Sequence, residues 1–268
     1  MAEEIRTEDR TGVGPMQKFG LDNAAAIKHL QRQMDTIDII DDLAGKIRFP
    51  VSEGSDLASL ASLAPDAPVP LIGSIRVGLA TAHEALTSMK PVISAALPGA
   101  PPLLFLQCLT RAALLGAGRV VFVLGPDGAD TRRNNAQIVV KKESVSLTRA
   151  LERHAAFEHL LGMKPPDTFV SEVSRRATQL GGGAPPGEEK MLQQMATVIG
   201  QSVARHNPDL DAGIVTEAVA SIWHRYSGAV HGYAWPEGCD GDFVSDFGIA
   251  VPVVHTAFDL AFKRGDAR

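Results

Sequence analysis

Apolar residues recur three or four positions apart in the first part of the chain. After residue 23 this spacing produces one continuous stripe, made of Ile27, Leu30, Met34, Ile37, Ile40, Ala44 and Ile47. The aspartates in the same segment lie mostly on its other side, which is typical of an amphipathic helix with one buried face. We therefore predict a long helix that begins after a capping Asp22 or Asn23 and ends before Pro50.

The same spacing predicts six further helices in the rest of the chain. They cover about residues 71–90, 103–125, 130–161, 190–206, 211–231 and 251–263. We expect Pro91 to end the first of these, because proline interrupts helical hydrogen bonding. Short valine runs such as Val120–Leu124 also fit a strand by period alone, but too few alternating runs exist to build a sheet. The predicted fold class is all-α, a bundle of six or seven helices with long irregular connections.

Polar and proline-rich stretches divide the chain into an arm and one domain. Residues 1–20 lack any apolar period and are predicted to form a mobile N-terminal arm. Residues 21–268 are predicted to form a single helical domain. Within it, residues 51–70 and 162–190 are rich in proline, glycine and small polar residues, so we expect them to act as linkers.

Composition narrows the class of protein. The chain has 268 residues, 45% of them hydrophobic, which is enough for a buried core and excludes extensive disorder. The formal net charge of −5 argues against a broad basic surface for long nucleic acids. The only cysteines, Cys108 and Cys239, are too few for a disulfide scaffold or a cysteine-built zinc site. The first residues lack the pattern of a signal peptide, so we expect a cytoplasmic protein.

The segment 103–124 is apolar and long enough to cross a bilayer. It also contains Arg111 and Arg119, and an arginine in lipid costs at least about 2.5 kcal/mol. We therefore predict a helix buried in protein, with no membrane partner. Its arginines then require polar neighbours, because an unpaired buried charge is costly.

Residues 221–236 concentrate the groups that can carry chemistry. They contain both tryptophans and both tyrosines of the chain, together with Arg225, His224 and His231. A guanidinium binds phosphate well, and an imidazole titrates near neutral pH. Together they suit RNA cleavage without a metal ion or cofactor: the imidazole moves protons while the cation stabilises the negative charge that develops on the phosphate.

Helical geometry separates this pair. Six residues along an α-helix correspond to about 240° of rotation and about 9 Å of rise. Arg225 and His231 therefore converge only if the helix loosens at Gly228 or ends near Gly232, or if a second subunit supplies one of them. The alternative is structural: Arg225 neutralises an acidic neighbour, and His231 with the following glycine ends the helix.

The segment Arg225-Tyr-Ser-Gly-Ala-Val-His231 resembles the Arg-x(4–6)-His signature of the HEPN (higher eukaryote and prokaryote nucleotide-binding) superfamily. The Ser-Gly-x-x-His-Gly run within it is similar to that of uncharacterised helical proteins from actinobacteria. In those proteins a Leu-x-Arg-x-x-Leu helix and an Arg-rich stretch come earlier in the chain. Leu109–Leu114 and Arg132-Arg133 stand in comparable places here.

This resemblance implies a homodimeric helical bundle that cleaves RNA without metal or cofactor, acting as a toxin or defence effector. Arg225 and His231 would be its catalytic residues, and an antitoxin or a nucleotidyltransferase would be its protein partner. The remaining candidate substrate-binding residues are Ser227, His224, Tyr226, Arg111, Arg132 and Arg133.

Two other functions remain open at this point. In one, the protein is a non-catalytic scaffold or a nucleotide-binding or ligand-binding protein, and the Arg-x5-His motif is structural. In the other, it is a ligand-sensing bundle in which Trp223, Tyr226 and Trp235 wall an apolar pocket. The useful discriminator is whether Arg225 and His231 face solvent in a shared concavity.

Overall fold

The structure is a computed structural model that describes residues 20, 24–96, 103–156, 165–180, 185–239 and 241–266. These residues form nine α-helices and one 3₁₀-helix and contain no strand, so the predicted all-α class is confirmed. The number of helices exceeds the six or seven expected. Almost all of the predicted arm, residues 1–20, lies outside the described residues.

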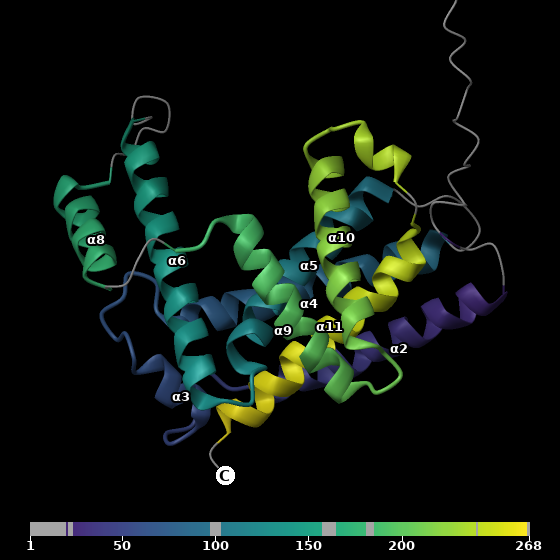
Figure 1. Cartoon of the computed structure of the whole chain (residues 1–268), viewed down its shortest axis with the longest axis horizontal. Helices are drawn as coiled ribbons and strands as arrows, with labels where there is room; N and C mark the ends of the chain where they lie inside the picture. The colour runs from purple at the N-terminus through teal and green to yellow at the C-terminus, as the bar shows by residue number, and fades with distance from the viewer. Residues whose placement is uncertain are drawn as a thin grey trace, which may run out of the picture.

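Figure 1 shows the arrangement of the helices. In chain order they are α2 (Ala24–Lys46), α3 (Asp56–Ala61), α4 (Leu71–Ala96), α5 (Leu103–Leu124), α6 (Ala129–Ala156), α8 (Asp167–Gln179), α9 (Glu188–His206), α10 (Ala212–Val230), the 3₁₀-helix η1 (Trp235–Gly238) and α11 (Phe243–Gly265).

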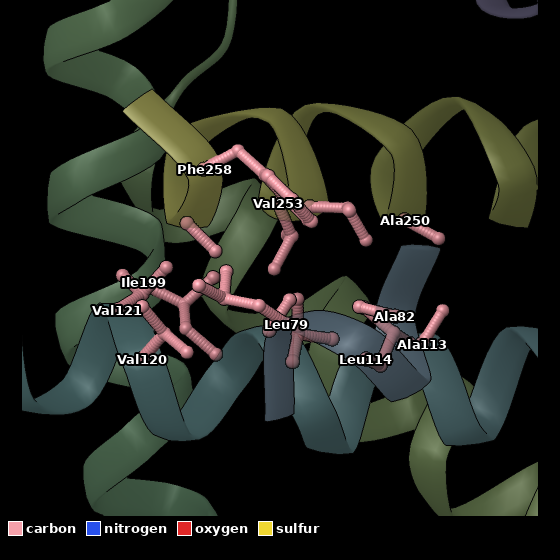
Figure 2. Close-up of a cluster of buried hydrophobic side chains, with 14 of the residues drawn as sticks. Leu79, Ala82, Ala113, Leu114, Val120, Val121, Ile199, Ala250, Val253 and Phe258 are labelled. Carbon is pink, nitrogen blue, oxygen red and sulfur yellow. The ribbon is translucent and has the colours of Figure 1, made fainter. Parts of the chain in front are cut away.

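Helix α5 lies at the centre of the bundle and packs against α4, α6, α9, α10 and α11. The close-up in Figure 2 shows side chains from several of these helices meeting in one apolar cluster. Leu114 and Val121 of α5 are there with Leu79 of α4, Ile199 of α9 and Phe258 of α11, all of them buried. Burial of this kind supplies the main driving force for folding.

Helices α5 and α11 are long and apolar enough to cross a membrane, but more than half of the apolar stretch of each is buried inside the bundle. Both arginines of α5 have polar neighbours, as their position required. Arg119 forms an ion pair with Glu143 at 3.1 Å. The Arg111 Nε donates a hydrogen bond to the Ser227 hydroxyl at 3.0 Å.

Two glycines allow α4 and α5 to cross in backbone contact. A Cβ atom placed on Gly116 would lie 2.4 Å from the carbonyl oxygen of Gly78, and one on Gly78 would lie 2.7 Å from the carbonyl oxygen of Gly116. Neither backbone can give way without moving a helix that carries a large part of the core. The crossing therefore requires glycine at both positions.

We expect Gly116→Ala to lower the free energy of unfolding by about 1–3 kcal/mol, as overpacking does in other cores. Gly45→Ala is the matched control, because Gly45 also lies in a helix but has no atom within 4 Å of the position of its Cβ. That control should leave stability unchanged or raise it by up to about 1 kcal/mol through helix propensity. Urea denaturation of both variants measures the difference, and equal midpoints would contradict the crossing.

Tertiary packing overrides two of the predicted boundaries. Helix α4 continues through Pro91 to Ala96, and the turn beyond the proline buries Ile93 in the core. Helix α11 begins at Phe243 rather than at residue 251, and Pro252 lies inside it. Burial of these turns outweighs the cost of proline in a helix, which is about 3 kcal/mol.

The two predicted linkers contain helices. Residues 51–70 include α3, which Ser55 caps and which buries Leu57 and Leu60. The described part of residues 162–190 includes α8, which packs against α6 and buries Val173 and Ala177. Both helices place few apolar residues in the interior, so their periodicity is weak beside the high proline and glycine content around them.

Candidate functional site

The C-terminal end of α10 fixes the position of His231. Asp211 caps the start of the helix by accepting a hydrogen bond from the Ile214 amide at 2.9 Å. At the other end, Gly232 adopts a φ of +73°, and its amide donates to the Ala229 carbonyl. The Tyr233 amide donates to the Gly228 carbonyl, which completes a Schellman ending. His231 is therefore the C-cap residue, and it is exposed.

Arg225 faces the start of α11, where it meets a buried carboxylate. Its Nη2 donates to Asp246 Oδ1 at 2.6 Å, and the Tyr226 hydroxyl donates to Asp246 Oδ2 at the same distance. The side chains of Arg225 and Asp246 are only 13% and 8% exposed. This is the acidic neighbour that the structural alternative required.

Burial and charge act against each other in this cluster. Burial raises the pKa of the Asp246 carboxyl, although the hydrogen bonds from Arg225 and Tyr226 act in the opposite direction. Burial also disfavours the charge on Arg225, but the hydrogen bond and charge of Asp246 outweigh it and raise the pKa of the guanidinium. Burial, with the nearby carboxylate, raises the pKa of Tyr226. The cluster is thus an ion pair maintained at a desolvation cost.

Part of the polypeptide stands between Arg225 and His231. The two residues are about 120° apart around α10 by the shorter way, and Gly228 lies midway between them in rotation and in rise. A Cβ atom on Gly228 would lie 2.5 Å from the Trp235 ring and 2.7 Å from Pro236. The start of η1 therefore packs directly onto this point of the helix. No hydrogen bond or ion pair joins Arg225 to His231 in the described structure.

On the other flank of α10, Arg111 reaches across from α5. Besides its hydrogen bond to the Ser227 hydroxyl, its guanidinium lies 5.6 Å from the centre of the Trp223 ring, which allows a cation–π interaction. Among the described residues, no carboxylate forms an ion pair with Arg111. Its positive charge is therefore held in place without being neutralised there.

His231 belongs to the same side of α10 as this cation. It follows Ser227 by one helical turn, about 6 Å, so the two side chains lie on neighbouring positions of one face. His224 is exposed on that face two turns before His231, and its ring meets the Trp223 ring edge-on at 5.0 Å. The predicted residues Arg111, Ser227, His224 and His231 thus gather on one surface, and Arg225 with Tyr226 lies on another.

Arg132 and Arg133 lie far from this surface. Arg132 is buried at the start of α6, where it donates to the carbonyls of Pro126 and Asp127 and pairs with Asp56. Asp56 also pairs with Arg264, at the opposite end of α11 from Asp246, and that separation is about 27 Å along the helix. Arg133 is exposed and pairs with Asp130 of its own helix.

A cavity of about 510 Å³ opens where α5, α10, η1 and α11 meet. Its apolar walls include Leu103, Leu104, Pro236 and Phe243. Its polar lining includes Gln107, Arg225, Asp242 and Asp246. Tyr226 contributes to the lining, but Trp223, Trp235 and His231 do not. Of the three aromatic residues expected to wall a ligand pocket, this cavity contains Tyr226 alone, and it holds Arg225 without His231.

Three residues of this cavity were not predicted from the sequence, namely Asp246, Gln107 and Asp242. The best available signal was Asp246, a lone carboxylate within the apolar run Phe243–Val251. A charge in such a position is rarely left without a partner. That rule would have predicted an arginine contact, though not which arginine makes it.

Comparison of the chain with protein-family models, curated proteins and solved structures finds no match. The function is therefore argued from the site itself. In the part of the chain that the structure describes, no group of three or more His, Cys, Asp or Glu residues is placed to hold a metal ion. The groups available for chemistry on this surface are two exposed imidazoles, one hydroxyl and the guanidinium that is hydrogen-bonded to it.

Proposed function

We propose that this protein is a metal-independent ribonuclease that uses the histidine of its HEPN-like motif, with its catalytic surface on the flank of α10 that carries His231. One observation carries the proposal. Arg111 lies on this flank with its charge unpaired among the described residues, fixed by Ser227 and Trp223, one helical turn from an exposed histidine. A cation and an imidazole on one face can together promote cleavage of a phosphodiester.

This proposal changes the role assigned to one arginine. From the sequence, Arg225 was the phosphate-orienting residue, but its guanidinium is paired with Asp246 and η1 separates it from His231. Arg111 carries no such neutralising partner among the described residues. We therefore assign phosphate binding to Arg111 and a positioning role to Arg225, which ties the end of α10 to α11.

The proposed reaction is an internal transfer on the RNA strand. The neutral His231 imidazole removes the proton of a 2′-hydroxyl, and the 2′-oxygen attacks the adjacent phosphorus while the bond to the 5′-oxygen breaks. Arg111 balances the negative charge that builds up on the phosphoryl oxygens. The departing 5′-oxygen takes its proton from water, and the imidazolium then gives its proton to the resulting hydroxide. The products are a 2′,3′-cyclic phosphate and a 5′-hydroxyl.

The cellular setting stays part of the proposal. A homodimer acting in the cytoplasm as a toxin or defence effector, held in check by an antitoxin or nucleotidyltransferase, is what the sequence resemblance implies.

The test uses purified protein and a fluorescent RNA in buffer containing EDTA. We expect cleavage of the RNA, no cleavage of DNA of the same sequence, and no cleavage of RNA whose 2′-hydroxyls are methylated, because each of these lacks the attacking group. Mass spectrometry should find cyclic phosphate ends. Cleavage of the DNA, or loss of all activity in EDTA, would contradict the mechanism.

A second candidate is a nucleotide-binding or ligand-binding protein without catalysis. The cavity of about 510 Å³ favours it, because a space of this size with a few polar groups on apolar walls is typical of small-molecule sites. In that case the protein binds a ligand there, and no RNA is cut by the wild type under any condition.

A further inference from the structure

The cavity beside Arg225 adjoins the proposed catalytic surface along two helices. On α5, Gln107 lines the cavity and Arg111 follows it by one turn on the same face. On α10, Gly232 and Tyr233 line the cavity and directly follow His231. The rings of His231 and Tyr233 lie 6.1 Å apart, centre to centre. The cavity therefore continues toward Arg111 along α5 and toward His231 along the end of α10.

We propose that this cavity receives the guanine base of a nucleotide next to the scissile phosphate, so that Arg225 and Gln107 select the base while Arg111 and His231 act on the phosphodiester. This inference rests on the proposed function, since it assigns a substrate to that site. In this proposal the Arg225–Asp246 pair joins α10 to α11 and also positions Arg225 to bind the base.

The hydrogen-bond donors and acceptors of the cavity complement those of guanine. Arg225 uses Nη2 on Asp246, and its Nη1 has no hydrogen-bond partner among the described residues, so it can donate to the guanine O6 or N7 acceptors. The Gln107 amide, which also has no partner there, can both donate and accept. The carboxylates of Asp242 and Asp246 line the same space and can accept from the amino group of the base.

The apolar groups supply the rest of the recognition. Tyr233 is 61% exposed at the mouth of the cavity, where its ring can stack on the base. Stacking on an aromatic ring stabilises the binding of any base, so it adds affinity without adding specificity. The choice therefore depends on the cation, the amide and the carboxylates. Adenine offers an amino donor where guanine offers O6, opposite the Arg225 donor.

Calorimetry with mononucleotides tests the inference without using cleavage. The His231→Ala protein is titrated with guanosine monophosphate, adenosine monophosphate and inorganic phosphate. We expect guanosine monophosphate to bind about tenfold more tightly than the other two, the effect of one hydrogen bond from a charged donor to a base acceptor. Equal affinity for the two nucleotides, or binding no tighter than inorganic phosphate, would overturn the base site.

Two variants localise the binding. Leu104→Trp adds a ring at the 55% exposed cavity wall and should abolish binding, and Gln107→Leu should weaken it by about three- to tenfold through one lost hydrogen bond. Phe105→Trp is the matched control, because Phe105 is also exposed on α5 but does not line the cavity. Circular dichroism checks that each variant is folded. Wild-type affinity in Leu104→Trp would place the ligand elsewhere.

Failure of this inference can be told from failure of the proposed function. If the wild type cuts RNA at all four bases equally and binds no guanosine monophosphate, the base site is wrong and the ribonuclease stands. If guanosine monophosphate binds selectively but no RNA is cut, the base site stands and the catalytic assignment is wrong.

Discussion

Substitution of His231 by alanine is expected to lower the rate of RNA cleavage by about 10²- to 10⁴-fold, the usual contribution of a general acid or base. His231 is exposed at the C-cap of α10, so its removal leaves no cavity in the core. The loss should appear in kcat at saturating RNA, with the far-ultraviolet circular dichroism unchanged. Single-turnover cleavage of a labelled RNA measures it.

Arg111→Ala should lower the same rate by about 10²- to 10³-fold, the range found when one group that stabilises transition-state charge is removed. Arg111→Lys keeps the charge but loses the Nε–H that donates to Ser227, so it should recover only part of the rate. Complete rescue by lysine would show that charge alone, without the orientation fixed by Ser227, is sufficient.

An arginine outside this surface provides a control for these variants. Arg133→Ala removes an exposed arginine at the far end of the molecule. This variant should keep nearly full activity. If His231→Ala cleaves as fast as Arg133→Ala, this surface is not catalytic and the ribonuclease proposal fails.

The long helices could be predicted from the sequence because each carries an apolar stripe over several turns. The stripe from Ile27 to Ile47 matches α2 closely, and the apolar segment after residue 103 is α5. The misplaced boundaries of the long helices have one cause. At Pro91, and before residue 251 in the last helix, burial of the flanking turns decided the outcome, and local sequence does not report burial across helices.

The candidate site was predicted only in part, for a related reason. The aromatic and titratable residues of α10 were visible in the sequence, and so was their division between two faces. Which distant residues meet each face was not visible, because Arg111 and Asp246 reach α10 from other helices. A buried charge needs a partner, so such contacts could be expected from the sequence. The sequence does not show which residue is the partner.

Asp246→Ala should be the most destabilising single change at this end of the bundle. It leaves the Arg225 guanidinium and the Tyr226 hydroxyl buried without their acceptor, since both donate to this carboxylate. Removal of one member of a buried ion pair costs about 3–5 kcal/mol, and urea denaturation should report a loss in that range. Asp130→Ala is the control, because Asp130 forms an exposed pair with Arg133 that contributes less than about 1 kcal/mol.

The double variant Arg225→Met with Asp246→Leu then separates stability from catalysis. Removal of both charges avoids an unpaired ion, so the part of the lost stability due to the buried guanidinium should return, while the Tyr226 hydroxyl still lacks its acceptor. If Arg111 is the phosphate-binding cation, the refolded double variant should retain kcat within about tenfold, a change of about 1.4 kcal/mol in the barrier, while its preference for guanine falls. A stable double variant with no cleavage would assign the cation role to Arg225 instead, because Arg111, Ser227 and His231 remain in place.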